Sequence, residues 1–290
     1  MTTPDANDCG SMQAPVPPTT NDCPLDLRAV PPEANVCPSD LTAVAPEWFK
    51  EWFDSPYYHQ LYAERDKKEA AALIEKLLAL LQPPPGSAML DVACGRGRHA
   101  YILAAHGYDV TGIDLSPATI AFARQFEREN LHFYIHDMRR LLCTNCFDYA
   151  FNFFTSFGYF RTKREHSNAI RMVSLALKSK GVFVLDYLNS SYAEQNLVPS
   201  SQKIIEGVTY TMTRCSDATH FYKRIKIEDE RTATPLEYIE KVAKFSLDDF
   251  REMFSMQGLH LQQAYGDYAL TPYDPRQSPR LLMVARKIAT

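Results

Sequence analysis

The sequence predicts an α/β protein built on a doubly wound, mostly parallel sheet, with an N-terminal helical lid and an inserted antiparallel sheet. Strand-like and helical segments alternate between residues 88 and 185, which is typical of a parallel sheet covered by helices on both faces. Aromatic residues at helical spacing precede this alternation. Strand-like segments in which apolar and polar residues alternate follow it, as in an antiparallel sheet.

Length and composition limit the class of protein. The 290 residues suffice for one large domain with additions, or for two small ones. A formal net charge of −4 gives no support for a nucleic-acid or membrane partner, and no apolar run has the length of a transmembrane helix. The N-terminus lacks the basic and apolar regions of a secretory signal. Seven cysteines, an odd number in a long chain, do not favour a disulfide scaffold and fit a reducing cytoplasm.

Residues 1–45 are expected to form a disordered tail. They are rich in Pro, Thr, Asn and Asp and have few large apolar residues with which to bury a core. A 14-residue repeat runs through them, which also allows a metal or partner motif built on three cysteines. The repeated positions are Asn7, Asn21 and Asn35; Cys9, Cys23 and Cys37; and Val16, Val30 and Val44.

Residues 46–86 are expected to form the helical lid. In "PEWFKEWF" the aromatic residues fall on one helical face, after a proline suited to the first helical turn. A second apolar stripe runs through residues 73–81, and three consecutive prolines at 83–85 end it.

Residues 87–200 are expected to form the main sheet and its helices. Ser116 followed by Pro117 is a strong signal for a helix start. The strand-like segments are Ala88–Ala93, Asp109–Ile113, Leu131–Ile135, Tyr149–Phe153 and Gly181–Leu185.

Residues 201–245 are expected to form the inserted sheet, because their apolar residues alternate with polar ones. Residues 246–290 should then complete the main sheet. "SLDDFREMFSMQG" predicts a helix with a capping box between Ser246 and Asp249 and a stop at Gly258. Strands at about 259–266 and 280–286 should return to the sheet.

The stretch "MLDVACGRGRHAYILAAHGYDVTGIDLS" carries the first functional signal. Gly95 and Gly97 follow the end of a predicted parallel strand, where such sheets bind ligands and where glycines allow close approach to the backbone. Asp114 ends the next strand and can accept hydrogen bonds from two ribose hydroxyls. This predicts a nucleoside cofactor. "GRGRHA" also matches a dinucleotide-binding pattern, but the charge of Asp91 just before the glycines does not favour a pyrophosphate and suits a cationic ligand.

Four motifs in order resemble those of the class I S-adenosylmethionine-dependent methyltransferases, whose core is Rossmann-like. They are "LDVACGRGRHA", "GYDVTGIDLS", "HDMRRL" and "FDYAFNFFTSFGYF", and the resemblance covers about residues 65 to 200. The inserted sheet more loosely resembles that of small-molecule members, the sugar N-methyltransferases and glycine methyltransferase-like enzymes. One departure is Ala93, where many members have glycine, and we expect it to cost a little room without loss of binding.

The resemblance implies S-adenosyl-L-methionine as cofactor and assigns residues to its methionine end. The backbone of Ala93, Gly95 and Gly97 would hold the methionine part. Asp91 would lie near its ammonium group, to which Phe153 would offer its backbone carbonyl.

At the nucleoside end, the resemblance assigns Asp114 to the ribose and Leu115 to one face of the adenine. Asp137 would accept a hydrogen bond from the adenine amino group, and Met138 would cover the ring.

The lid is expected to close over the cofactor. Tyr58, Tyr62 and Arg65 fall on one helical face, with Arg65 placed near the cofactor carboxylate and the aromatic rings able to contact a sulfonium. Methyl transfer is an in-line displacement that mainly requires positioning, with a base only where the nucleophile is protonated. Tyr58 and Tyr159 are the candidate catalytic residues, Tyr159 for orienting the nucleophile.

Five further residues are expected to face the methyl acceptor, because they follow the fourth and fifth strands or lie before the last one. They are Ser156, Tyr187, Asn189, Tyr268 and Arg280. Arg280 would suit an acceptor carboxylate or phosphate.

No metal site is expected. Cys143 and Cys146 form a C-x-x-C pair, but the sequence offers no two further ligands at suitable spacing. His99, at the start of the helix after the glycines, is interpreted as structural.

The sequence therefore predicts a cytoplasmic, S-adenosylmethionine-dependent methyltransferase, monomeric or homodimeric, that acts on N or O of a small molecule. Three alternatives remain open at this stage: an RNA or protein methyltransferase with the same core, a nicotinamide-dependent oxidoreductase, and a cofactor-binding interaction module without activity.

Overall fold

The computed structural model describes residues 37–63 and 67–289. Its helices are α1 (Ser39–Thr42), α2 (Trp48–Asp54), α3 (Pro56–Leu61), α4 (Lys67–Leu81), α5 (Arg98–Ala105), α6 (Pro117–Ala123), the 3-10 helix η2 (Arg124–Phe126), α7 (Lys163–Ala176), α8 (Ser190–Gln195) and α9 (Leu247–Ser255). Its strands are β1 (Ala88–Val92), β2 (Asp109–Asp114), β3 (Leu131–Ile135), β4 (Phe147–Asn152), β5 (Leu177–Leu188), β6 (Ser200–Ile205), β7 (Val208–Ser216), β8 (His220–Glu228), β9 (Leu236–Ala243), β10 (Leu259–Tyr265) and β11 (Arg280–Lys287).

The main sheet has the order β10-β11-β5-β4-β1-β2-β3. Strands β1 to β5 pair in parallel, and β11 runs antiparallel to both of its neighbours. The predicted α/β class, the mostly parallel sheet and the return of the two last strands to it are confirmed. The order reverses between β1 and β4, which is the point where sheets of this type bind ligands.

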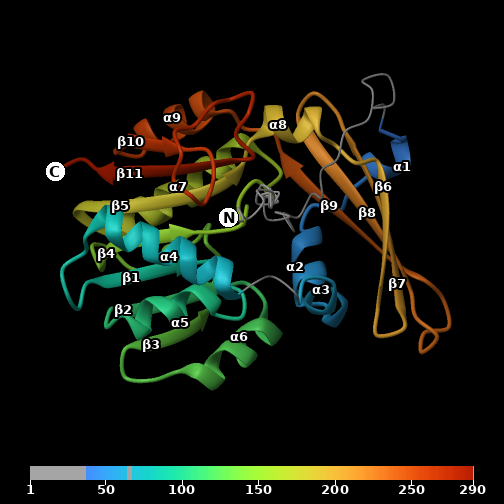
Figure 1. The fold of residues 1–290 in the computed structure, drawn as a ribbon, viewed down its shortest axis with the longest axis horizontal. Coiled ribbons are helices and arrows are strands. Elements are labelled where there is room, and N and C mark those ends of the chain that lie inside the picture. Colours follow the sequence, from blue (N-terminus) through green and yellow to red (C-terminus); the bar gives the residue numbers. More distant parts are fainter. Residues whose placement is uncertain (1–36, 64–66, 290) are drawn as a thin grey trace, which may run out of the picture.

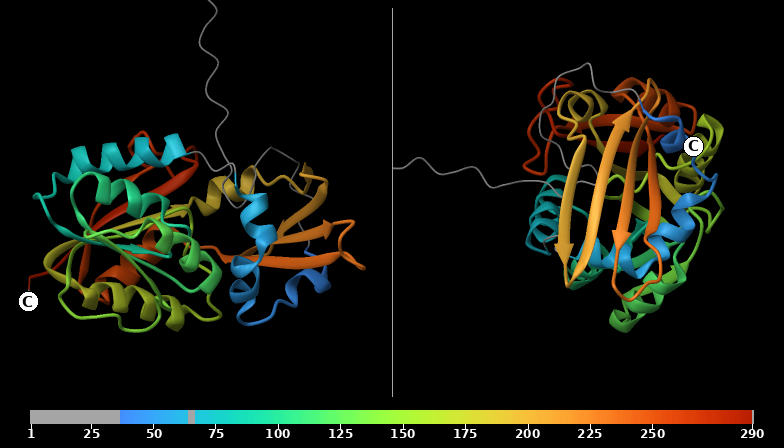
Figure 2. Two further views of the ribbon diagram at one scale, coloured as in Figure 1. Left: turned by 90° about the horizontal axis from the view of Figure 1, so that it is seen from below. Right: turned by 90° about the vertical axis from the view of Figure 1, so that its right-hand side faces the viewer.

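Helices cover both faces of the main sheet (Figure 2). On one face α4 and α5 contribute Leu73, Leu77 and Leu103 to a core that includes Phe133 and Phe151. A second core on the opposite face receives side chains from α7 and α9. Because successive strand residues point to opposite faces, β1 supplies Met89 to the first core and Leu90 to the second.

The second sheet is an antiparallel meander of order β6-β7-β8-β9, inserted between α8 and α9 as predicted. It stands beside the main sheet, and α2 and α3 lie between the two sheets (Figure 1). The turn joining β7 to β8 is held by Asp217, which accepts hydrogen bonds from the backbone of Thr219 at 2.6 Å and of His220 at 2.8 Å and from the hydroxyl of Tyr222 at 2.8 Å. Burial would raise the pKa of Asp217, but these hydrogen bonds outweigh it and hold the pKa well below its usual range.

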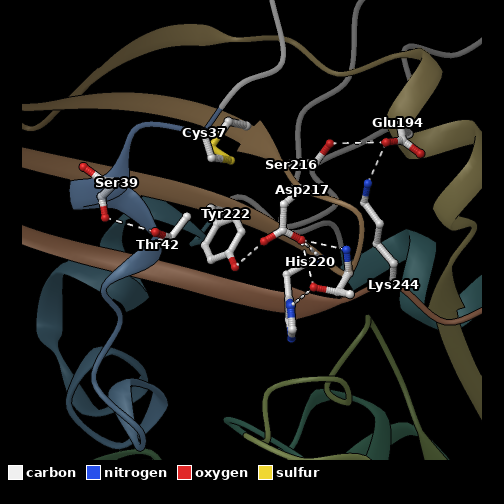
Figure 3. Close-up of a disulfide and its surroundings, with 11 residues drawn as sticks. Cys37, Ser39, Thr42, Glu194, Ser216, Asp217, His220, Tyr222 and Lys244 are labelled. Atoms are coloured by element: carbon white, nitrogen blue, oxygen red, sulfur yellow. Dashed lines mark hydrogen bonds and ion pairs between the residues drawn. A yellow bond between two sulfur atoms is a disulfide. The ribbon is translucent and has the colours of Figure 1, made fainter.

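The segment before the lid is attached to the inserted sheet, contrary to the expectation that the tail extends to residue 45. Cys37 forms a disulfide with Cys215 of β7 (Figure 3), and Leu41 of α1 is buried beside Tyr222. Asp40 also forms an ion pair with Arg224 of β8. The other repeated positions, at residues 7–35, lie outside the described residues. The sequence near Cys37 offers only a few apolar and acidic side chains, such as Leu41 and Asp40. They were too few to predict that this segment packs on the inserted sheet.

A second disulfide joins Cys143 and Cys146. The expectation that disulfides are not favoured is therefore wrong for two cysteine pairs, and the number of cysteines no longer supports a reducing compartment. In the described part of the chain, no helix is long and apolar enough to cross a membrane.

Replacing Cys215 with Ser should lower the melting temperature, because a cross-link between positions 178 residues apart restricts the unfolded chain. A loss of about 2–4 kcal/mol in the free energy of unfolding is typical for a native disulfide. Dithiothreitol should destabilise the wild type to a similar extent and leave Cys215→Ser nearly unchanged, because only the short loop between Cys143 and Cys146 remains to be opened. Cys143→Ser, which opens a loop of only 3 residues, is the matched control and should cost less. Rapid alkylation of Cys37 and Cys215 in the untreated protein would contradict the pairing.

Candidate functional site

A cavity of about 770 Å³ opens at the carboxyl ends of β1, β2 and β4. The cavity is surrounded by the lid, the glycine turn after β1, the segments that follow β2 and β3, the turn after β4, and strand β9 of the inserted sheet. Twelve of the predicted site residues line it: Tyr58, Tyr62, Ala93, Gly95, Gly97, Asp114, Leu115, Asp137, Met138, Phe153, Ser156 and Tyr159. Arg65 lies outside the described residues.

The glycine turn has the open backbone that a bound ligand needs. Gly95 and Gly97 have left-handed φ angles of 56° and 77°, a region that glycine adopts without strain. A Cβ atom on Gly95 would meet nothing within 4 Å, whereas one on Gly97 would lie 2.5 Å from the ring of Phe133. Gly97 is thus required by packing, and Gly95 leaves space beside the cavity. Ala93 also has a left-handed φ, 57°, so the position where many relatives carry glycine is strained here.

The two strand-end aspartates have different surroundings. Asp114 lines the cavity and accepts hydrogen bonds from the backbone N–H groups of Gly95 and Ser116, each at 3.0 Å. Burial raises the pKa of its carboxyl group. It therefore connects the glycine turn to the end of β2 and still presents carboxylate oxygen to the cavity.

Asp91, which was expected near a ligand ammonium, is not among the residues that line the cavity. It is buried beneath the glycine turn, 1% exposed, and accepts a hydrogen bond of 3.2 Å from the backbone of Ala100 in the first turn of α5. Burial raises its pKa to about 7, against the opposing effect of the Ala100 hydrogen bond. The side chain of Asp91 points into the protein, so it meets the start of α5 and not the cavity.

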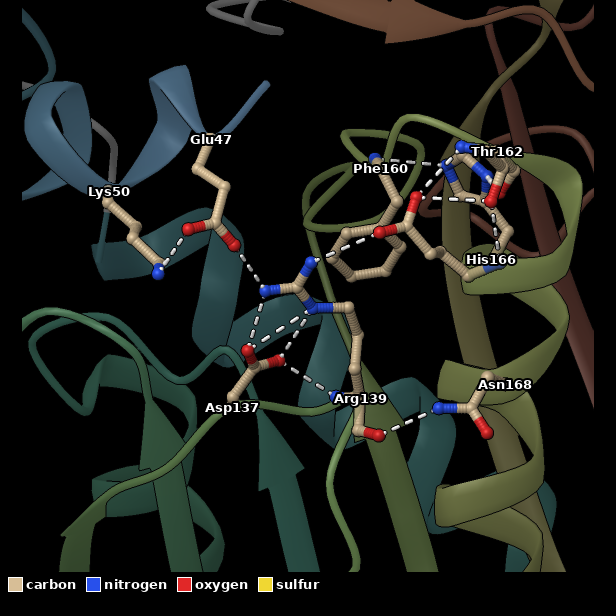
Figure 4. Close-up of polar contacts among 9 residues, drawn as sticks. Glu47, Lys50, Asp137, Arg139, Phe160, Thr162, His166 and Asn168 are labelled. Carbon is tan, nitrogen blue, oxygen red and sulfur yellow. Dashed lines mark hydrogen bonds and ion pairs between the residues drawn. The ribbon is translucent and has the colours of Figure 1, made fainter. Parts of the chain in front are cut away.

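Asp137 is bound by an arginine that sequence reasoning missed. Arg139 contacts both carboxylate oxygens of Asp137, at 2.7 Å and 3.1 Å, and donates to Glu47 at the start of the lid at 2.8 Å (Figure 4). Burial favours the neutral form of Asp137, but the bonds from Arg139 outweigh it and lower the pKa below its ordinary value. The guanidinium of Arg139 also lies 5.1 Å from the ring centre of Phe160. Arg139 thus links the lid, the segment after β3 and the turn after β4.

The turn after β4 has two left-handed residues, Phe154 and Thr155, with φ angles of 57° and 56°. Asp186 at the end of β5 holds this turn, because its side chain accepts from the backbone of Phe154 at 2.8 Å. Arg280 in turn binds Asp186 at 2.7 Å and the hydroxyl of Thr155 at 2.9 Å.

Four of the five residues expected to face the acceptor do not line the cavity. Arg280 is buried in its ion pair with Asp186, and Tyr268 donates to the same carboxylate at 2.9 Å. Asn189 donates to the carbonyls of Pro275 and Ser278, at 3.0 Å and 2.7 Å. Tyr187 is fully buried and donates to the carbonyl of Ala243, and burial raises its pKa. These four side chains form hydrogen bonds with Asp186 or with backbone carbonyls of the fold. Of the five residues, only Ser156 lines the cavity.

Aromatic rings form the lid side of the cavity. The ring centres of Tyr58 and Tyr62 are 5.0 Å apart, as their helical spacing predicted, and those of Phe53 and Tyr159 are 5.2 Å apart. The hydroxyl of Tyr159 donates to the backbone carbonyl of Thr155, so its proton is engaged within the turn. This arrangement suits Tyr159 as part of the wall better than as a proton carrier.

His59 and His99 are further cavity residues. His59 lies 3.1 Å from the hydroxyl of Thr119, and burial together with the nearby charge of Arg96 lowers its pKa to about 4. His99 packs with its ring centre 4.4 Å from that of Phe153, which fits the structural role expected for it. Across the described residues, no group of three or more His, Cys, Asp or Glu side chains could hold a metal ion.

The inserted sheet contributes Glu240 and Val242 to the cavity, and neither residue was among the predicted site residues. Glu240 is 3% exposed and accepts from the indole of Trp52 at 2.7 Å and the hydroxyl of Tyr62 at 3.0 Å. Lys223 of β8, 2% exposed, also donates to the Tyr62 hydroxyl. A signal was present: Glu240 occupies an inward position in the period-2 pattern of β9, where a carboxylate needs a partner.

Comparisons with known proteins agree with this geometry. The family described as "Methyltransferase domain" matches residues 84–251. The chain is 26% identical over 257 residues to YqeM of Bacillus subtilis (strain 168), a protein named as a methyltransferase, covering 83% of this chain and 97% of that one. It is 25% identical over 209 residues to the dTDP-3-amino-3,6-dideoxy-alpha-D-glucopyranose N,N-dimethyltransferase of Streptomyces fradiae, covering 68% and 78%.

The fold is similar to that of a solved amino pentose methyltransferase, CalS10 of Micromonospora echinaspora, whose structure holds S-adenosylmethionine. The TM-score is 0.60 at 22% identity, covering 80% of this chain and 97% of that one.

Replacing Asp91 with Asn should remove one source of pH dependence in stability. The folded chain keeps the Asp91 proton up to about pH 7, whereas the unfolded chain loses it near 3.8, so this group makes stability fall as pH rises through that window. Urea unfolding at several pH values should show the wild type losing stability relative to Asp91→Asn by up to about 1.4 kcal/mol per pH unit, and levelling off above pH 7. A difference between the two proteins that stays constant with pH would refute the assignment.

Proposed function

The chain belongs to the methyltransferase-domain family, and on that premise we propose that it transfers methyl groups from S-adenosyl-L-methionine to the nitrogen of a small-molecule amine. The family model covers residues 84–251, more than half of the chain, and the enzyme is a methyltransferase that uses this cofactor. The nitrogen and the small size of the acceptor are the proposed part. They are suggested by the amino-sugar relatives and by the walls that the lid and the inserted sheet give the site.

The residues at the strand ends fit the cofactor. Gly95 leaves open space at the turn, and the backbone there can approach a bound methionine group. Asp114 offers a buried carboxylate to ribose hydroxyls, and Asp137 with Met138 lines the cavity where an adenine ring would lie. Asp91 supports this cradle through Ala100 instead of touching the ligand.

Lid aromatics and the inserted sheet close the other side of the cavity, and this enclosure is the observation that carries the proposal. Phe49, Phe53 and Tyr58 face it from the lid, and Glu240 with Val242 faces it from β9. A pocket walled on both sides accommodates a small molecule more readily than a polynucleotide, and the three cationic side chains that line it, Lys50, Arg96 and Arg98, are matched by Asp114, Asp137 and Glu240.

The protein's contribution to the reaction is positioning and the exclusion of water. The bound cofactor supplies an electrophilic methyl group. The turn after β4, held by Asp186 and Arg280, sets the wall beside which the nucleophile must lie, and the aromatic rings can face a positive charge. An amine attacks through its lone pair, so it must be bound uncharged or lose a proton before attack.

Incubation with S-adenosylmethionine and dTDP-3-amino-3,6-dideoxy-alpha-D-glucopyranose, followed by mass spectrometry, tests the acceptor class. The expected result is a gain of one or two methyl groups on the amino sugar. A 3-hydroxy analogue and a mixed RNA serve as comparison acceptors. Methylation of RNA in place of all small amines, with strong salt dependence, would overturn the small-molecule assignment.

Asp114→Ala should weaken binding of S-adenosylhomocysteine, because it removes hydrogen bonds to a charged acceptor, each contributing roughly 1.5–3 kcal/mol. Asp109→Ala, at the exposed start of the same strand, is the matched control and should bind normally. Calorimetry on the three proteins measures the effect. Equal affinity in all three would remove Asp114 from the ribose site.

A further inference from the structure

A buried polar cluster joins the lid to the inserted sheet at the wall of the cavity. It consists of Trp52 and Tyr62 from the lid, Lys223 from β8 and Glu240 from β9. The two charged side chains are almost completely buried. Burying an ion pair costs free energy that its mutual attraction repays only when the remaining hydrogen bonds are satisfied, so the bonds of each oxygen decide what the cluster can do.

The donors around Glu240 converge on one of its oxygens. Oε1 accepts from Trp52 at 2.7 Å and from Tyr62 at 3.0 Å. Oε2 lies 3.4 Å from the ammonium nitrogen of Lys223, but no donor of the described chain makes a hydrogen bond to it. A buried carboxylate oxygen without a hydrogen bond destabilises the fold, and a donor on a ligand would recover that free energy.

Glu240 also lines the cavity, together with the aromatic side chains of the lid. Its position fixes where a ligand donor would sit: on the inserted-sheet side, opposite the glycine turn and Asp114, which also line the cavity. The charge of Lys223 compensates that of the carboxylate. The pair therefore favours a neutral hydrogen-bond donor over a second cation, and a neutral amine is the form that keeps a lone pair for attack.

We propose that Glu240, held by Trp52, Tyr62 and Lys223, accepts a hydrogen bond from an N–H of the acceptor amine through Oε2 and so makes the site specific for amines that still carry hydrogen. The proposal rests on the proposed N-methyl transfer and assigns its acceptor-binding residue. Oε2 is itself buried next to the cavity that Glu240 lines, so the acceptor reaches it by displacing the side chains that cover it. A neutral tertiary amine has no N–H and leaves Oε2 unsatisfied, so it binds weakly.

Aniline, N-methylaniline and N,N-dimethylaniline are suitable probes, because they carry two, one and no N–H groups and all are uncharged at mildly alkaline pH. Calorimetry on the wild-type complex with S-adenosylhomocysteine should give at least tenfold weaker binding for N,N-dimethylaniline than for the other two. Its extra methyl groups make it the most apolar of the three, so the hydrophobic effect alone predicts the reverse order.

Glu240→Gln should abolish this preference. The amide oxygen must take the place of Oε1, because Trp52 and Tyr62 both donate there, so the amide N–H₂ replaces Oε2 and presents a donor to another donor. Glu237→Gln is the control, since Glu237 lies on the same strand, half exposed, and pairs with Arg224. This variant should retain the wild-type order of affinities.

Two results would overturn the inference: a wild-type complex that does not discriminate among the anilines or binds none of them, and a preference for N–H that survives in a folded Glu240→Gln. The wild-type comparison stands even if the variant fails to fold. Failure of S-adenosylhomocysteine itself to bind would instead refute the proposed function, so the two failures are distinguishable.

Discussion

The buried ion pair between Asp186 and Arg280 is the interaction on which the site depends. It joins the end of β5 to the start of β11, and the same carboxylate holds the backbone of Phe154 in a left-handed conformation. Removing one partner of such a pair typically costs about 3–5 kcal/mol, because the other charge stays buried. The turn after β4 can therefore keep a strained shape, and its residues Phe153 to Tyr159 keep their place at the cavity.

The two sides of the cavity are built on different physical principles. The strand-end side is made mostly of backbone, glycine and carboxylates that are fixed by the sheet, as in Gly95 and Asp114. The other side is made of side chains carried by the lid and the inserted sheet, which touch each other through the ring of Tyr62 against Lys223 and the hydrogen bonds of Trp52 and Tyr62 to Glu240. Variation in the second set can change what the protein methylates without disturbing the first.

Much of the fold was predictable from the sequence because its signals are local. The alternation of strands and helices, the Ser116 and Ser246 caps and the period-2 patterning of β7 to β9 each depend on neighbouring residues. The cofactor side of the site was predictable for the same reason, since its motifs follow strand ends directly.

The buried partners on the lid and inserted-sheet side of the cavity were not predictable, because they depend on contacts between residues far apart in the sequence. Arg280 was expected to face the acceptor, but its partner, Asp186, lies 94 residues away and buries it. Glu240 and Trp52, 188 residues apart, meet only through the packing of the inserted sheet on the lid. A polar residue that follows a strand can serve the ligand or the fold, and only its partners distinguish the two.

The disulfide between Cys37 and Cys215 has a consequence for the order in which the chain is made. The cysteines are separated by 178 residues, and strands β1 to β6 lie between them. At synthesis rates of 5–20 residues per second, Cys37 precedes Cys215 by roughly 9–36 s. The thiol of Cys37 must stay unreacted during that interval, and it can find its partner only once β7 exists. Covalent closure therefore comes only after strands β1 to β6 have been synthesised, although β10 and β11 of the main sheet are still to follow.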